Sequence, residues 1–369
     1  MLLEENYNVF LENEELIIRD NHNRILVKQK NPLGQPPSKC LYLREQDILF
    51  LGSANGILKI TRRKNPFQVY EMGKSIWGFY PKKITDNWLT NLIENKPTIN
   101  FPKSFKGTDN QLWIGTNTNK LIAYQANQPP VIYESKIPGE LWMPFENSYT
   151  NKIWVGTNKG LIYLDQYSKQ FVRFDLPNIT KNIAVRHFHQ NDKGIWILTS
   201  EGIFLMDAHS ERIIKQYTQA DGLPNHNFMH LHEDKDGVFW LATKGGGLIR
   251  WDISQNAIKQ FTQKEGLSHN VLYAVYEDDY ENLWLPSNYG LMQFNKNTST
   301  TRVYLPQNGI PHEEFNTFEH AQAADGTLYF DGLGEAITFH PKDIHQNANN
   351  FTPPLHLSLI HISEPTRPY

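Results

Sequence analysis

An aromatic residue recurs at nearly equal intervals along this chain of 369 residues. Each copy lies inside a short apolar segment, which a polar turn joins to a second apolar segment, as in Gly194–Ile203. The recurring positions are Phe50, Trp113, Trp154, Trp196, Trp240, Trp284 and Tyr329. The intervals between them are 63, 41, 42, 44, 44 and 45 residues. A period of this size predicts a repeat architecture in which each unit packs against the next.

One unit shows why we expect four strands in each repeat. Asn270–Asp278 is an almost continuous apolar run, as expected of a strand that is buried on both faces. Leu283–Ser287 and Leu291–Asn295 flank a turn that ends in Gly290, and glycine readily adopts the positive φ of a tight hairpin. Thr301–Leu305 alternates polar and apolar residues, which indicates a half-exposed outer strand.

Four short strands within about 40–45 residues are typical of a β-propeller blade. We therefore predict an all-β fold, a β-propeller of about seven four-stranded blades. Six units are regular, and a degenerate first blade is expected near Glu15–Ile18. In such a fold the large anchor ring fills the wedge between adjacent sheets. We accordingly assign the seven anchor residues to the core.

Composition excludes several classes of protein. Apolar residues make up 39% of the chain and aromatic residues 12%, which is enough for a sizeable core. The net charge is −3 without a block of like charge, so we expect no nucleic-acid partner. The single cysteine, Cys40, permits neither an internal disulfide nor a cysteine-based metal site. No apolar run approaches the roughly 18 residues of a membrane-spanning helix, and no signal peptide is evident.

Several stretches resemble the two-component regulator propeller repeat. They are Asp236–Leu248, the linkers Asp221–Asn225 and Glu265–Asn270, and the last blade with Asp325–Phe330 and Phe339–Ile344. The resemblance covers roughly residues 45–354. It implies the extracytoplasmic, periplasmic sensor domain of a histidine kinase, a hybrid two-component protein or a related regulator, mostly from Bacteroidetes. It also implies that a β-sandwich, a transmembrane helix and an output domain follow, and that the ligand is a glycan fragment in many relatives.

These observations give a domain plan. We expect the propeller sensor domain at residues 1–344, with an insertion near residues 96–106 that separates two parts of one unit. Residues 345–356 are expected to be an exit linker toward the β-sandwich. Residues 357–369 have the sequence of a translated sequencing adapter, so we expect them to be an artefact of sequencing.

The sequence contains no recognised catalytic motif: no nucleophile elbow, phosphate loop, zinc-protease motif or dinucleotide fingerprint. Arg186–His189 and His230–Asp234 each place two histidines at alternate positions of a predicted first strand. Two histidines on one face are the beginning of a metal site, but no third ligand is evident, so we predict no metal and no cofactor. Packing within the repeat and a ring of inward polar groups both explain the pattern.

Acidic pairs end two of the predicted first strands, at Glu233–Asp234 and Glu277–Asp278. We expect their carboxylates to accept hydrogen bonds from turn amides, because Asp commonly caps such turns. Their spacing gives no support to a pair of catalytic carboxylates.

A ligand is expected on the face where the inter-blade linkers meet the anchor hairpins. Two tryptophans there, Trp77 and Trp142, depart from the Gly-Leu linker pattern and are candidates to stack on a sugar ring. The predicted ligand contacts are Trp77, Trp142, Asn225, His226, His269, Tyr289, His312 and Glu313.

We therefore expect a non-catalytic sensor propeller that binds an oligosaccharide or another small ligand. The intact protein is expected to be a homodimer that meets the membrane only through segments outside this chain. Two alternatives remain open. One is a streptogramin-lyase-like enzyme, which a His–Glu pair facing the central mouth would favour. The other is a structural propeller that serves only in dimerisation.

Overall fold

The computed structural model places the described residues in two compact units, the first built before residue 66 and the second covering Pro66–Asn349. The described residues are 2–4, 7–12, 14–20, 25–30, 36, 38–43, 48–53, 56–61, 66–71, 104–107, 111–116, 118–125, 128, 130–179, 182–332 and 335–348. The sequence prediction instead placed one propeller over residues 1–344. Each unit is therefore described by itself.

The first unit contains two antiparallel sheets. One has four strands in sequential order, β1 (Leu2–Glu4), β2 (Tyr7–Glu12), β3 (Glu15–Asp20) and β4 (Ile25–Lys30). The other has three strands, β5 (Lys39–Leu43), β6 (Ile48–Ser53) and β7 (Gly56–Thr61). Leu16 and Ile18 of β3 are buried, whereas the anchor Phe50 of β6 is half-buried.

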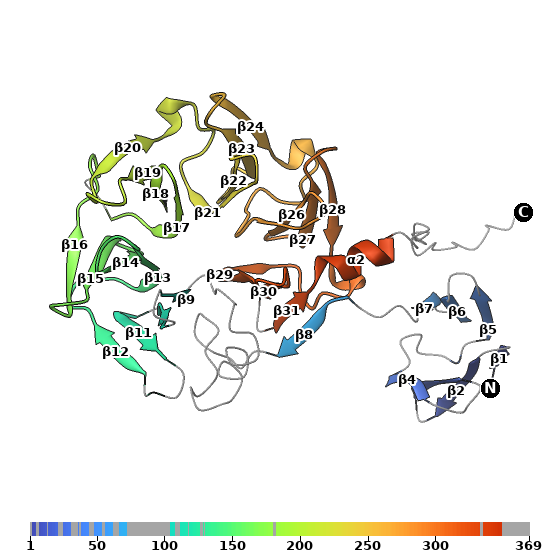
Figure 1. Cartoon of the computed structure of the whole chain (residues 1–369). Coiled ribbons are helices and arrows are strands. Elements are labelled where there is room, and N and C mark those ends of the chain that lie inside the picture. Colours follow the sequence, from blue (N-terminus) through green and yellow to red (C-terminus); the bar gives the residue numbers. More distant parts are fainter. Residues whose placement is uncertain are drawn as a thin grey trace, which may run out of the picture. The chain divides into compact units, whose positions relative to one another are not determined.

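The described part of the second unit consists of six four-stranded antiparallel sheets that lie around a common centre as blades (Figure 1). The first two blades are β9 (Ser104–Lys106), β10 (Leu112–Ile114), β11 (Lys120–Tyr124) and β12 (Val131–Glu134), then β13 (Leu141–Glu146), β14 (Lys152–Thr157), β15 (Gly160–Asp165) and β16 (Gln170–Phe174). The next two are β17 (Val185–Asn191), β18 (Gly194–Thr199), β19 (Gly202–Met206) and β20 (Ile213–Tyr217), then β21 (Phe228–Glu233), β22 (Phe239–Thr243), β23 (Leu248–Asp252) and β24 (Ala257–Phe261). The fifth is β25 (Tyr276–Glu277), β26 (Asn282–Pro286), β27 (Leu291–Asn295) and β28 (Thr300–Tyr304).

The sixth blade combines both ends of the unit. Its first three strands are β29 (Phe315–Gln322), β30 (Leu328–Gly332) and β31 (Glu335–Phe339), but its outermost strand is β8 (Gln68–Glu71). The β8–β31 ladder places Val69 opposite Ile337. Because β8 lies more than two hundred residues before its partner, this ladder ties the start of the unit to its end.

The propeller fold is confirmed, whereas a ring of about seven blades is not. Six blades are seen in the described part of the second unit, and the sheet that contains Phe50 belongs to the first unit. The long interval from Phe50 to Trp113 thus crosses a boundary between units. The predicted insertion near residues 96–106 is wrong at its end, because residues 104–106 form β9, with Phe105 opposite Trp113. Residues 96–103 lie outside the described residues.

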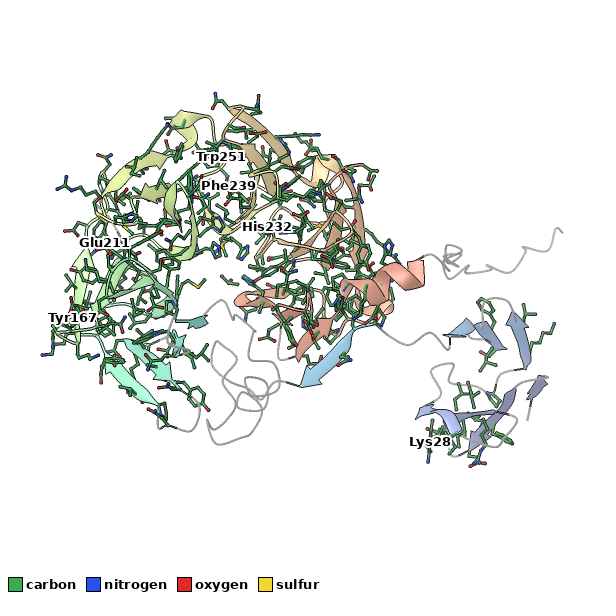
Figure 2. All side chains as sticks on the ribbon, in the orientation of Figure 1. Lys28, Tyr167, Glu211, His232, Phe239 and Trp251 are labelled. Carbon is green, nitrogen blue, oxygen red and sulfur yellow. The ribbon has the colours of Figure 1, made fainter. Side chains whose placement is uncertain are left out.

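The anchor aromatics of the second unit pack between neighbouring blades. Trp196 contacts Phe239 of the next blade edge-to-face, with ring centroids 4.8 Å apart, and Trp251 at 6.0 Å (Figure 2). This is the arrangement expected of large rings in a wedge between twisted sheets. The six anchors that are at most 5% exposed are Trp113, Trp154, Trp196, Trp240, Trp284 and Tyr329.

The hairpins follow the predicted chemistry. Gly202 and Gly290 have φ values of 116° and 81°, in the region that glycine favours. A hydroxyl closes each turn, since Thr199 Oγ1 donates to Gly202 O and Ser287 Oγ donates to Gly290 O, both at 2.8 Å. The first strand of the fifth blade is shorter than predicted: only Tyr276–Glu277 forms a continuous ladder with β26.

Helix α2 (Pro341–Ala348) follows β31. His340 caps its start, with Asp343 N donating to His340 O at 2.9 Å, and Ile344 is buried. His345 stacks on Tyr280 with ring centroids 3.9 Å apart. Residues 345–348 therefore continue a helix and do not begin the predicted exit linker 345–356. Residues 349–356 and 357–369 lie outside the described residues.

Candidate functional site

One face of the ring is formed by the linkers between blades and by the hairpins that join the second and third strands. Gly202 N donates to His226 O of the next linker at 2.8 Å, and Gly290 N donates to Glu313 O at 2.6 Å. Each linker thus lies against the hairpin of the preceding blade. We call this surface the loop face.

Six of the predicted ligand contacts lie along an arc of the loop face. Ser268 Oγ donates to Tyr289 O at 2.6 Å, which joins two neighbouring linker and hairpin segments. The side chain of Asn225 contacts Gly246 of the adjacent hairpin so closely that no Cβ would fit there. Tyr289 is 43% exposed. The arc contains Asn225, His226, His269, Tyr289, His312 and Glu313.

The two predicted tryptophans are not part of this arc. Trp77 lies outside the described residues. Trp142 is half-buried in β13, and its indole Nε1 donates to Glu140 Oε2 at 2.7 Å. Trp142 therefore belongs to a different part of the loop face, three blades before Tyr289.

His312 is held between its linker and the last blade. Its Nε2 lies 2.8 Å from Glu335 O, and its ring occupies the space in which a Cβ on Gly332 would sit. Its Nδ1 is buried without a hydrogen-bond partner in the described part of the chain. Burial lowers the pKa of this imidazole. These contacts give His312 a packing role.

A β-bulge marks the loop end of three successive inner strands, β13, β17 and β21. The extra residues are Trp142, Arg186 and Met229. Bulges redirect a side chain and strengthen the local twist, and they are frequent beside functional sites. Arg186 was not among the residues predicted from the sequence, although the equivalent positions Trp142 and Met229 carry side chains of different chemistry.

A pocket of about 510 Å³ opens on the loop face beside the hairpin that joins β14 to β15. Most of its exposed lining is polar, with charged or amide groups from Lys159, Arg173, Asp175 and Asn182. The apolar part of its wall consists of Leu161, Phe174, Leu176, Ile179 and Ile183. A pocket of this size with several polar groups can hold a small polar molecule.

Three histidines of the inner strands form a cluster deeper in the ring. The rings of His187 and His230 lie 4.1 Å apart, and those of His230 and His320 lie 5.1 Å apart. Tyr276 Oη lies 2.8 Å from His320 Nδ1. Burial lowers the pKa of His187 and of His320 to about 3, so both are neutral at physiological pH. The structure thus brings together inward polar groups from four blades.

The other two histidines of the same pattern bridge adjacent blades. His189 Nε2 lies 2.6 Å from Glu233 Oε2, and His232 Nε2 lies 2.8 Å from Glu277 Oε2 (His232 is labelled in Figure 2). Both pairs occupy the ends of the inner strands that are remote from the loop-face hairpins. Lys296, whose side chain is only 7% exposed, forms an ion pair with Glu277 of the second pair.

The aspartates of the acidic pairs behave as predicted, and the glutamates do not. Asp278 Oδ1 accepts hydrogen bonds from the turn amides of Tyr280 and Asn282, while its Oδ2 accepts the indole N–H of Trp284 at 2.8 Å. Glu277 instead binds the histidine of the preceding blade. The aspartate therefore fixes the turn and satisfies the anchor indole at the same time.

No group of three or more His, Cys, Asp or Glu side chains among the described residues could hold a metal ion. No helix in that same part of the chain is long and apolar enough to cross a membrane. The groups available for chemistry on the loop face are hydrogen-bonding side chains, aromatic rings, cations and carboxylates such as Glu313.

One segment of the fourth blade, from the linker before β21 to the end of β22, matches a known repeat. Residues 222–245 match the family model for the two component regulator propeller. The chain carries a two-component regulator propeller repeat. The resemblance predicted from the sequence is therefore confirmed. The matched segment includes Asn225 and His226 of the loop-face arc.

Most of this chain is similar to one part of a histidine kinase. Histidine kinase P4 of Formosa agariphila is 28% identical over 342 residues, which cover 88% of this chain. The alignment covers 23% of that protein, so the chain spans less than a quarter of its relative.

Solved structures show the same fold. The extracellular domain assigned to a hybrid two component system of B. thetaiotaomicron superposes with a TM-score of 0.67 and 19% identity, covering 98% of this chain and 56% of that one. A catalytically inactive virginiamycin B lyase from Staphylococcus aureus with quinupristin superposes with a TM-score of 0.52 and 13% identity, covering 92% and 97%. At these identities the likeness extends to the propeller fold alone.

Proposed function

We propose that this chain is the non-catalytic sensor propeller of a two-component-type regulator, located in the periplasm. The observation that carries the proposal is the match of residues 222–245 to the two component regulator propeller, within a stretch similar to a histidine kinase. The extracellular placement of the structurally similar B. thetaiotaomicron domain agrees with this location.

The ligand in this proposal is an oligosaccharide or another small molecule bound on the loop face. The 510 Å³ pocket offers a site of suitable size, with a largely polar lining that can hydrogen-bond sugar hydroxyls. Aromatic and amide side chains of the arc, such as Tyr289 and Asn225, supply further contacts. Ligand binding would change the relative orientation of two propellers in a homodimer, and the output part of the regulator would read that change.

A thermal-shift screen of the full chain against oligosaccharides tests the binding step. A ligand at 100 times its dissociation constant adds about 2.7 kcal/mol to the free energy of unfolding. This corresponds to a rise in Tm of about 3–5 °C for a domain of roughly 300 residues or more. The absence of any ligand across a broad screen would favour the structural dimerisation propeller instead.

Two variants locate the ligand. Ile179→Trp fills the pocket and should abolish the rise in Tm, whereas Ile214→Trp on β20, where the side chain is 56% exposed, should leave it unchanged. An equal rise in both variants would place the ligand elsewhere.

The signalling step is tested in the intact gene. A downstream transmembrane helix followed by a kinase or helix-turn-helix domain supports the sensor proposal. A stop codon shortly after Pro354 would contradict it.

The lyase alternative has less support. His–Glu pairs are present, but His189–Glu233 and His232–Glu277 bridge blades at the end of the inner strands away from the loop face. Both pairs are therefore remote from the proposed ligand site on the loop face. Turnover of virginiamycin B by the purified chain would overturn the non-catalytic proposal.

A further inference from the structure

Arg186 is a half-buried cation at the loop end of inner strand β17. Its Nη1 donates to Asn227 Oδ1 at 2.6 Å and to Phe228 O at 3.5 Å, both in the next blade. These acceptors are neutral. Arg186 makes no ion pair with any residue of the described chain, and its Nε and Nη2 have no hydrogen-bond partner there.

The Arg186 guanidinium is thus partly removed from water without a carboxylate among the described residues to offset the loss. A charge that leaves water without an opposite charge loses solvation that neutral acceptors replace only in part. Burial accordingly lowers the pKa of the Arg186 guanidinium to about 10, and no carboxylate counteracts the change. An anion beside the free nitrogens would restore the lost interaction.

The fold does not require a cation at this position. The same bulge position holds Trp142 in the preceding blade and Met229 in the following one. Both blades pair normally without a charge there. Arg186 is therefore better explained by something that it binds than by the packing of the ring.

The backbone of a second basic residue, Lys244, lies beside the same contact. Lys244 N donates to Asn227 O at 2.9 Å, and the Lys244 side chain is exposed. Lys244 makes no ion pair within the described residues either. Asn227 thus accepts a hydrogen bond from the Arg186 guanidinium through its side chain and from the backbone N–H of Lys244 through its carbonyl.

We propose that Arg186, assisted by Lys244, binds an acidic group of the ligand on the loop face, either a carboxylate, a sulfate or a phosphate. The inference rests on the proposed sensor function and adds the chemical class of the ligand. A guanidinium suits all three groups, because its planar fork donates two parallel hydrogen bonds to two oxygens of one anion.

The test measures binding of defined probes to the full chain by calorimetry and by thermal shift. Glucuronate, sodium sulfate and sodium phosphate are compared with glucose and with sodium chloride at equal ionic strength. The expected result is that at least one of the three anions raises the Tm while chloride does not. The anion that acts identifies the group as carboxylate, sulfate or phosphate.

Three variants assign the effect to Arg186. Arg186→Gln keeps a donor for Asn227 but removes the charge, and it should weaken anion binding about 30-fold or more. Arg186→Lys should retain part of the affinity, since it keeps the charge but not the fork. Arg212→Gln removes an exposed arginine just before β20, away from the loop face, and it should have no effect.

The possible outcomes separate the two proposals. An anion response that is equal in Arg186→Gln and the unchanged chain would overturn the inference, and so would the absence of any response to all three anions. Neutral oligosaccharides that bind equally well to Arg186→Gln would leave the sensor function standing and remove only its anionic ligand. Anion binding without any effect on dimerisation or signalling in the intact regulator would keep Arg186 as a binding residue and remove the sensor function.

Discussion

Acid should destabilise this propeller through His320, and the substitution His320→Gln should remove that sensitivity. His320 is only 4% exposed, and its Nδ1 lies 2.8 Å from Tyr276 Oη. Burial lowers its pKa to about 3. The unfolded chain has an ordinary imidazole pKa of about 6.5. Between these two values the unfolded state binds a proton that the folded state excludes.

The magnitude follows from proton linkage. Stability is complete above pH 6.5 and falls as the pH decreases toward 3, because the folded-state pKa lies below the unfolded one. One pKa unit corresponds to about 1.36 kcal/mol, so His320 alone should cost about 2 kcal/mol between pH 7 and pH 5. The pKa of His187 is also about 3, and this residue should add a similar amount.

The assay is urea unfolding of the full chain at pH 7, 6 and 5, followed by tryptophan fluorescence. Glutamine retains hydrogen-bonding groups for Tyr276 but does not titrate in this range. The free energy of unfolding of His320→Gln should therefore fall about 2 kcal/mol less between pH 7 and pH 5 than that of the unchanged chain.

Tyr276→Phe is the matched control, because it removes the same hydrogen bond and keeps the imidazole. It should shift the stability at every pH by a similar amount and leave the slope intact. An identical pH slope for His320→Gln and the unchanged chain would refute the reasoning. A slope that flattens equally in Tyr276→Phe would assign the effect to the hydrogen bond.

Three further changes have defined outcomes. Asp278→Ala leaves the buried indole N–H of Trp284 without an acceptor and should cost about 2–3 kcal/mol in urea unfolding. The cost should be at least about 1 kcal/mol smaller in a Trp284→Phe background, and simple additivity would contradict this. Lys296→Met removes the cation held among Asp234, Glu277 and Glu281, and should cost about 3 kcal/mol at pH 7. Burial raises the pKa of Glu277, but hydrogen bonds from His232 and Lys296 outweigh this effect and lower it. The stability lost in Lys296→Met should therefore shrink as the pH falls below about 4, where Glu277 becomes protonated. An unchanged loss of stability at low pH would contradict the argument. Deletion of residues 1–71 removes β8 and should speed hydrogen exchange in β31, whereas deletion of 1–65 keeps β8 and should not. Equal exchange in the two would argue against closure by β8.

The local structure of the blades could be predicted because it depends on residues close in sequence. The hairpin at Ser287–Gly290 needs a hydroxyl and a glycine three positions apart, and both are visible in the chain. The aspartate caps were predictable for the same reason, since Asp278 bonds amides two and four residues ahead.

The assembly of the blades was predicted less well. The prediction of about seven blades combined sheets that the structure assigns to two separate units. Regular spacing in the sequence does not show where one ring ends. Closure by β8 pairs Val69 with Ile337, and no local pattern relates two such distant segments. The four residues 345–348 were expected in a linker, but burial of Ile344 against the last blade stabilises a helix there.

The candidate site was likewise predicted only in part from the sequence. Sequence reasoning selected the linkers and hairpins, and the structure brings six of the predicted residues into one arc. It did not select Arg186, because a single arginine in a strand is ordinary until its neighbours are known. Only the packing of β17 against the next linker shows that this charge has neutral partners.

The sequence by itself determined the repeat, the four-stranded blade, the buried anchors and the propeller family, since each depends on periodicity and on contacts within one unit. The tertiary structure decided which sheets share a ring, which strand closes it, and how the histidines divide between a neutral cluster and inter-blade pairs. It also decided which cations of the loop face lack a counter-charge among the described residues. The physical reason is that burial and charge compensation are set by neighbouring blades, about 40 residues or more away in the chain.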